Sequence, residues 1–88
     1  MKTKITVETL RQRLTVIANS KKDSCYINGI RLFLKNWDSK TLVEIKRLCE
    51  QIKEVAVSDE LFSIDVFGKK GTAFFKSLDI ESIDLRDN

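Results

Sequence analysis

Histidine and proline are both absent from this sequence of 88 residues. Without histidine, catalytic triads and zinc sites that use imidazole are excluded, as is the commonest acid–base group near neutral pH. Without proline, and with only three glycines, the chain holds no segment typical of a linker. No apolar run approaches the ~20 residues that a membrane span needs, and the lysines near Met1 precede no signal-peptide core. We therefore predict a single small domain over residues 1–88, located in the cytoplasm, with no membrane partner.

Cysteine is also scarce, with only Cys25 and Cys49. They form neither a CxxC pair nor a metal-binding spacing, and without a secretion signal we expect two free thiols. Both lie on predicted apolar faces, which indicates two small core residues. The acidic residues Asp79, Glu81 and Asp84 near the C-terminal end match no calcium-binding loop. We expect neither a metal nor a cofactor.

Charge is mixed in sign and unevenly distributed along the chain. Lys and Arg outnumber Asp and Glu by 16 to 13, which gives a net charge of +3. Residues 1–44 hold nine basic and four acidic side chains, whereas residues 45–88 hold seven and nine. A mixed solvated surface accounts for such a pattern, but a positive region on one side of the fold would suit an anionic partner.

Two stretches repeat apolar residues at three- and four-residue spacing, which is typical of amphipathic helices. The first stretch predicts a helix over 7–19, with Thr6 as its N-cap. The second predicts a helix over 39–55, with Asp38 as its N-cap and Trp37 as a packing residue just before it.

Two other stretches alternate apolar and polar residues, which is typical of β-strands. Residues 24–35 centre on Asn28-Gly29, a dipeptide favoured in two-residue hairpin turns because both turn positions need positive φ. The pattern of residues 61–77, with a glycine-containing turn at 68–71 in its middle, predicts a second hairpin.

The predicted order is helix, hairpin, helix, hairpin, which defines an α+β fold. The economical arrangement packs the two helices on one face of an antiparallel sheet built from the two hairpins. Residues 2–5 also fit a short N-terminal strand, and residues 78–88 fit a helical turn or an edge strand equally well. The other face of such a sheet would stay open to water or to a partner.

This open face would carry aromatic and basic side chains together. More aromatic residues point outward than isolated exposed apolar side chains require, so we expect a contact patch. Lysines in the turn of the second hairpin would extend the patch. The candidate binding residues are Tyr26, Arg31, Phe33, Lys35, Phe67, Lys69, Lys70, Phe74 and Lys76.

Part of this patch resembles a known RNA-binding sequence. Residues 70–77 are similar to the RNP1 segment of RNA-recognition motifs, in which a strand presents aromatic residues on an open sheet face. Four of the eight positions match, namely Lys70, Gly71, Ala73 and Phe74, and two aromatic positions are not filled. The element order differs from that family, because here the segment follows the second helix. The resemblance implies lysines at a glycine turn beside a base-stacking aromatic ring.

No catalytic constellation is recognisable, because a base, a nucleophile and an oxyanion donor cannot be assigned to specific residues. We therefore predict a non-enzymatic binding protein whose leading ligand is RNA or single-stranded nucleic acid. The alternative is a small inhibitor or adaptor, of the kind that phages and mobile elements encode, that blocks a host, toxin or defence protein. A homodimer through the patch is compatible with either function. Terminal segments folded over the patch would instead make it part of the core.

Overall fold

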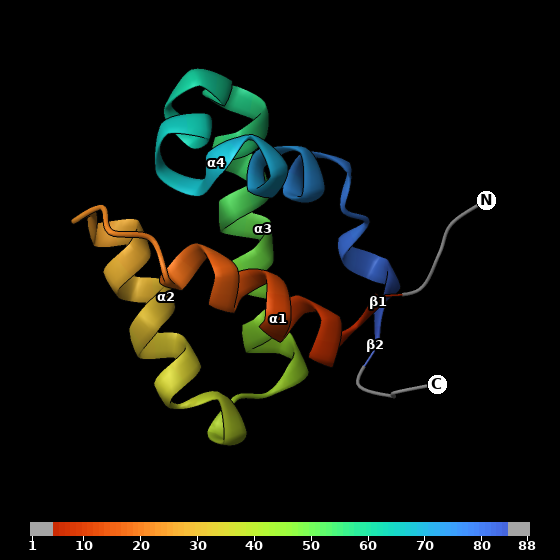
Figure 1. The fold of residues 1–88 in the computed structure, drawn as a ribbon. Coiled ribbons are helices and arrows are strands. Elements are labelled where there is room, and N and C mark those ends of the chain that lie inside the picture. Colours follow the sequence, from red (N-terminus) through yellow and green to blue (C-terminus); the bar gives the residue numbers. More distant parts are fainter. Residues whose placement is uncertain (1–4, 85–88) are drawn as a thin grey trace.

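The computed structural model describes residues 5–84 and is dominated by helices (Figure 1). Within this range, four α-helices and two 3₁₀ turns follow one another, and a pair of two-residue strands joins the two ends of the described chain. In chain order the elements are β1 (Ile5–Thr6), α1 (Val7–Ala18), α2 (Cys25–Lys35), η1 (Trp37–Ser39), α3 (Leu42–Ser58), α4 (Glu60–Ser77), η2 (Ile80–Ser82) and β2 (Ile83–Asp84).

The predicted α+β class is wrong. Helices α2 and α4 replace the two hairpins, and the strands β1 and β2 run parallel, with Ile5 paired to Ile83. The N-terminal strand expected at 2–5 overlaps β1 at Ile5 alone, and residues 2–4 lie outside the described residues. Both alternatives for residues 78–88 occur in succession, as η2 and then β2, with residues 85–88 again outside the description.

The first predicted helix is confirmed as α1, and its N-cap is as expected. The side chain of Thr6 accepts a hydrogen bond from the backbone N–H of Thr9 at 3.2 Å. This bond satisfies one of the amides that the start of a helix leaves without a helical partner. The buried side chains of α1, spaced three and four residues apart, are Leu10, Leu14 and Ile17.

The second predicted helix is confirmed as α3, but it begins at Leu42 and its N-cap is Thr41, not Asp38. The side chain of Thr41 accepts from the backbone N–H of Glu44 at 3.3 Å, and the Glu44 carboxylate accepts from the backbone N–H of Thr41 at 2.8 Å. This reciprocal capping box sets the start of the helix. Trp37 is buried in η1 ahead of the helix, as expected of a packing residue.

The first predicted hairpin is wrong, because the same residues form α2. Ser24 caps this helix by accepting a hydrogen bond from the backbone N–H of Tyr26 at 3.2 Å. Ile27 and Ile30, which a hairpin would place opposite each other, are both buried on one face of the helix. Residues three apart are neighbours on a helix surface, so the apolar pattern of this short stretch fits either structure.

The turn expected at Asn28-Gly29 is absent, because among the described residues only Gly68 has a positive φ. The change from strand to helix also moves Cys25, which is exposed instead of buried in the core as predicted. Both cysteines are free thiols, in agreement with the sequence-based expectation.

The second predicted hairpin is wrong in its strands, although the chain does reverse there. Helix α4 bends at Gly68, whose φ of 83° and ψ of 165° lie in a region open essentially to glycine alone. A continuous helix would hold Glu60 and Lys76 about 24 Å apart. Their side chains instead form an ion pair, with Nζ and Oε2 separated by 2.6 Å. The turn is therefore real, but its arms are two helical segments, 60–67 and 69–77 (Figure 1).

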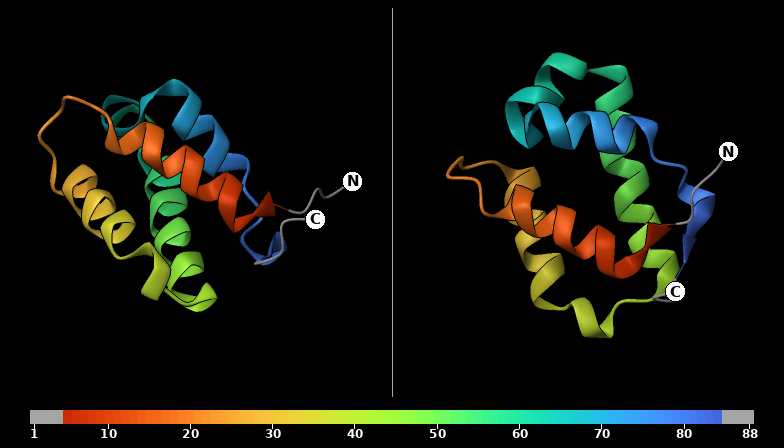
Figure 2. Two further views of the ribbon diagram at one scale, coloured as in Figure 1. Left: turned by 60° about the horizontal axis from the view of Figure 1, so that its bottom comes forward. Right: turned by 45° about the vertical axis from the view of Figure 1, so that its right-hand side comes forward.

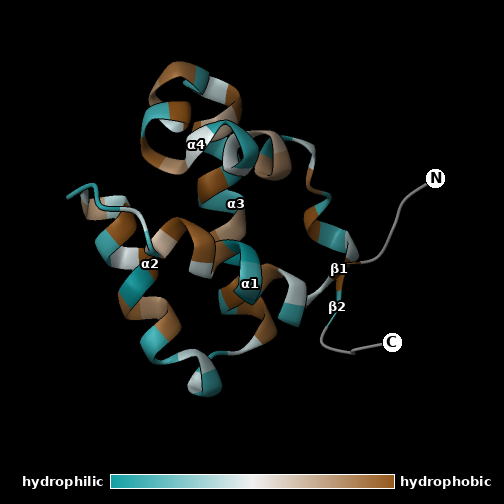
Figure 3. Cartoon of the chain, in the orientation of Figure 1, coloured by the Kyte–Doolittle hydropathy of each residue, from teal (hydrophilic) through white to brown (hydrophobic). Residues whose placement is uncertain are grey.

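The core lies between the four helices of the described chain, with α3 packed most extensively against α4 and α1 against α2. All four helices carry apolar as well as polar stretches (Figure 3). Cys49 is fully buried as predicted, and burial raises the pKa of its thiol from 9.0 to about 12. The buried hydroxyls of Ser63 and Thr72 share a hydrogen bond of 2.8 Å between the two segments of α4. Within residues 5–84, no helix is long and apolar enough to cross a bilayer.

Candidate functional site

A groove of about 340 Å³ lies between α1 and the bend of α4. In both views of Figure 2, the second segment of α4 runs beside α1. We call this feature the basic groove. Its lining residues are Arg13, Val16 and Ile17 of α1 and Phe67, Gly68, Lys69, Lys70, Gly71, Phe74 and Phe75 of α4.

Two glycines shape the basic groove. Gly68 turns the chain so that the second segment of α4 starts at the groove. Gly71 lies where this segment meets α1, since a Cβ atom at Gly71 would stand 3.5 Å from the Cδ1 atom of Ile17 and 3.4 Å from the Cβ atom of Phe67. The groove is therefore bounded by the contact of this segment with α1 on one side and by the bend on the other.

The groove is positively charged. Three of its ten lining residues are cationic, Arg13, Lys69 and Lys70, and none of the ten is acidic. The guanidinium carbon of Arg13 lies 5.0 Å from the ring centre of Phe74, a cation–π contact. Such a site favours an anionic ligand that also has an apolar or aromatic part.

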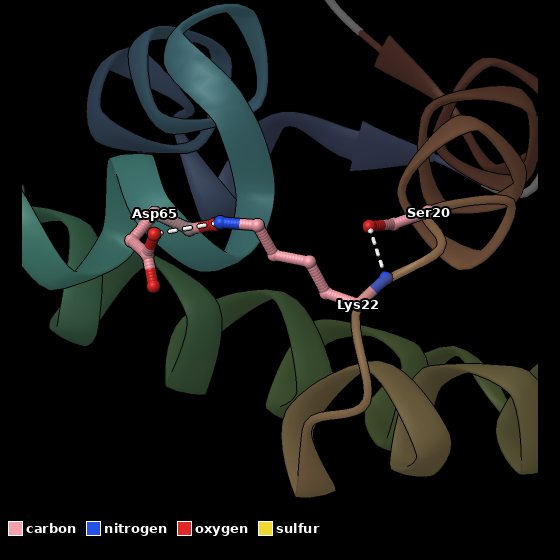
Figure 4. A network of polar contacts seen from close by, with 3 residues as sticks. All are labelled: Ser20, Lys22 and Asp65. Atoms are coloured by element: carbon pink, nitrogen blue, oxygen red, sulfur yellow. Dashed lines mark hydrogen bonds and ion pairs between the residues drawn. The ribbon is translucent and has the colours of Figure 1, made fainter.

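A polar contact beside the groove joins the α1–α2 loop to α4 (Figure 4). The ammonium group of Lys22 donates to the backbone carbonyl of Asp65 and lies 2.6 Å from the Oδ1 atom of the same residue. Asp65 belongs to the last turn of the first segment of α4, where carbonyls lack helical donors and a cation is favourable. The backbone N–H of Lys22 also donates to the hydroxyl of Ser20 at 3.2 Å. Lys22 thus steadies the bend instead of adding a free charge to the groove.

Four of the nine predicted binding residues meet in the basic groove: Phe67, Lys69, Lys70 and Phe74. Their setting differs from the prediction, because the segment 70–77 is helical and presents no open sheet face. The fold implied by the resemblance to RNP1 is therefore wrong, although its lysines and aromatic ring do lie together. Phe67 is only 6% exposed and forms the floor of the groove, whereas Phe74 is half-buried.

Arg31 and Lys76 are used in contacts elsewhere. Arg31 donates to the backbone carbonyls of Ala18 at 2.8 Å and Ser20 at 2.6 Å, which fastens the end of α1 to α2. Lys76 forms the ion pair with Glu60 that joins the two segments of α4. Neither side chain lines the basic groove.

The remaining three predicted residues, Tyr26, Phe33 and Lys35, all belong to α2 and lie outside the basic groove. The ring of Tyr26 meets the ring of Phe67 edge-on, with centroids 6.0 Å apart. The ring of Phe33 packs in the same manner on Trp37 at 5.9 Å. Lys35 is exposed at the end of the helix.

Sequence reasoning missed the contribution of α1, and Arg13 above all. Arg13 and Ile17 are four residues apart and therefore share a face of the helix, but only the packing of α1 against α4 brings this face to the bend. The sequence did contain one signal, since Val16 is apolar but lies outside the apolar face predicted for the helix over 7–19. In the structure, Val16 is 71% exposed and lines the groove.

A second hollow of about 290 Å³ lies between α2 and α3. We call it the neutral hollow, because none of its lining residues is charged. They are Cys25, Tyr26, Gly29, Ile30, Leu48, Gln51 and Ile52.

Within residues 5–84, no group of three or more His, Cys, Asp or Glu side chains is placed to hold a metal ion. Asp79 instead caps the short turn η2, where its carboxylate accepts from the backbone N–H of Glu81 at 3.2 Å and from the hydroxyl of Ser82 at 2.9 Å. Comparison of the chain with protein-family models, curated proteins and solved structures finds no match. Function is therefore inferred from the chemistry of the basic groove.

Proposed function

We propose that this protein binds RNA or other single-stranded nucleic acid in the basic groove and acts by binding alone, without catalysing a reaction. One observation carries the proposal: the groove combines three cations with an accessible aromatic ring and has no carboxylate in its lining. The cations can pair with the phosphate groups of a nucleic acid, and unpaired bases can stack on the ring.

The cations of the groove are available to a ligand. Two ion pairs occur within residues 5–84, and neither involves Lys69, Lys70 or Arg13. Both lysines are exposed and adjacent at the bend, so one strand of phosphates can meet them in succession. Phosphate contacts of this kind make affinity fall steeply with salt.

The test is binding to a fluorescein-labelled strand of about 12 uridines, measured by anisotropy over a range of salt concentrations. Replacing two phosphate contacts in Lys69→Glu/Lys70→Glu should lower affinity more than tenfold and flatten the slope of log K against log salt by about 1.4. The matched control is Lys35→Glu/Arg47→Glu, which changes the net charge equally at exposed positions outside the groove. Equal binding by parent, variant and control would contradict the proposed function.

A second candidate function is binding to a protein target, as a small inhibitor or adaptor. A different surface favours it, where Leu61 is 83% exposed and the neighbouring Phe62 is 40% exposed. The ring of Phe62 meets that of Tyr26 edge-on at 5.7 Å, so apolar groups from α2 and α4 adjoin there. Binding through this surface would depend little on salt and would survive the change of both groove lysines.

We further propose the cytoplasm as the compartment, which suits two free thiols, and homodimerisation as compatible with either function. Light-scattering mass of the purified protein, with and without the uridine strand, distinguishes a monomer from a dimer. Purification without nuclease would show whether RNA accompanies the protein.

A further inference from the structure

We infer that the basic groove captures one unpaired nucleobase on the ring of Phe74, with Arg13 over the base and the adjoining phosphate at Lys69 and Lys70. This inference rests on the proposed function and adds the part of the ligand that enters the groove. It makes a nucleotide, and not a bare phosphate chain, the unit of recognition.

The size of the groove suits a single base. Its volume of about 340 Å³ lies at the small end of the range for pockets that hold small molecules, about 300–1,000 Å³. The bend of α4 and the contact between Gly71 and α1 bound this space. A base already paired within a duplex could not enter it, since both of its faces and its pairing edge are occupied.

Phe74 is the ring on which a base would stack. Three phenylalanines line the groove, but Phe75 is fully buried and Phe67 is 6% exposed, so these two form the floor. Phe74 alone of the three is half-buried and offers part of its ring. The ring is held edge-on against Phe75, with centroids 5.0 Å apart, so it is presented at a defined angle.

Arg13 already occupies the place of a stacking partner. Its guanidinium lies over the ring of Phe74 at 5.0 Å, and its side chain is exposed and joins no ion pair within residues 5–84. An exposed arginine can swing aside at little energetic cost and then cover a base from the opposite face, since guanidinium planes stack on bases as aromatic rings do.

One of the two lysines shares a helix face with the stacking ring, which suits the phosphate that adjoins the base. Lys70 precedes Phe74 by four residues, so the two side chains share one face of the second segment of α4. Apart from the three cations, the side chains that line the groove have no polar group to read the edge of a base. We therefore expect stacking with little preference among the bases.

The experiment compares three labelled strands of about 12 units under one salt condition: oligouridine, an abasic strand with the same phosphates, and the same oligouridine paired to its complement. We expect the abasic and the paired strands to bind about 5- to 150-fold more weakly than oligouridine, the range for one stacked base. Phe74→Leu, which keeps an apolar side chain in place, should remove this difference. The matched control Phe62→Leu changes an exposed ring outside the groove and should preserve it.

The outcomes separate the inference from the proposed function. Equal binding of oligouridine and the abasic strand would overturn base capture and leave phosphate binding standing. Binding of the paired strand as tight as that of oligouridine would overturn it as well. No binding of any strand would overturn both. Circular dichroism melting of each variant confirms that it is folded, and a Phe74→Leu variant that is folded but still prefers bases would also overturn the inference.

Discussion

The basic groove and the neutral hollow are similar in volume, about 340 and 290 Å³, and both are floored by apolar side chains. They differ in charge, because three cations line the first and no charged residue lines the second. They also differ in the backbone, since Gly68 bends the chain at the groove, whereas Gly29 lies inside helix α2 at the hollow. The bend therefore distinguishes the candidate binding site from the neutral hollow, because it starts a new helical segment whose first two residues, Lys69 and Lys70, line the groove together with α1.

The largest expected effect comes from the two glycines. Gly68→Ala should destabilise the fold by about 1–3 kcal/mol, because the φ and ψ of Gly68 are strained for any residue with a Cβ atom. Gly29→Ala should have the opposite sign and stabilise it by about 0.5–1 kcal/mol, because alanine is the better residue in a helix and an added Cβ meets nothing within 4 Å. Urea unfolding measures both changes. If Gly29→Ala destabilised the protein as much as Gly68→Ala, residues 25–35 would not be helical.

An intermediate effect is expected from Cys49, which lies on α3 and is buried. Its pKa is raised to about 12 in the folded protein from 9.0, so above pH 9 the unfolded chain loses a proton that the folded chain keeps. The contribution of Cys49 to stability is therefore complete well below pH 9 and falls by about 1.4 kcal/mol in total between pH 8 and pH 10. Urea unfolding of parent and Cys49→Ala at pH 8, 9 and 10 should show a steeper decline for the parent. Identical slopes would mean that the thiol is not buried.

The smallest effect is expected from filling the neutral hollow. Cys25 is exposed there and should react with a maleimide under native conditions, whereas Cys49 should not. The attached group should leave the affinity for oligouridine within twofold of the parent, because the neutral hollow and the basic groove share no lining residue. Loss of nucleic-acid binding after this modification would indicate that the ligand binds in the neutral hollow and not in the basic groove.

The sequence predicted α1 and α3 because their apolar residues keep helical spacing over long stretches. The N-cap Thr6 of α1 was predicted correctly, whereas Asp38 was predicted in place of Thr41 as the N-cap of α3. It did not predict α2, since Ile27 and Ile30 meet equally well across a hairpin and along a helix. Only burial against the other helices decides between the two structures, and the Asn28-Gly29 dipeptide pointed to the wrong one.

The candidate site was predicted in part for a similar reason. A glycine turn at 68–71 brings Phe67, Lys69, Lys70 and Phe74 together whether its arms are strands or helices, so these four residues were identified despite the wrong secondary structure. Residues on the faces of the false hairpins, such as Lys76, were assigned to the site by the strand alternation and lie elsewhere. Arg13 could not be predicted as a site residue, because its position at the groove depends on a contact between helical segments more than 50 residues apart in the sequence.

The most direct test of the central claim is a ¹H–¹⁵N correlation spectrum of the protein titrated with oligouridine. No proline interrupts the chain, so amide signals are available along both hollows. We predict that the largest shifts fall on Arg13, Gly68, Lys69, Gly71 and Phe74, while Gly29, Leu48 and Gln51 stay unmoved. Shifts centred on the neutral hollow, or a spectrum unchanged by excess ligand, would contradict the assignment of nucleic-acid binding to the groove between α1 and α4.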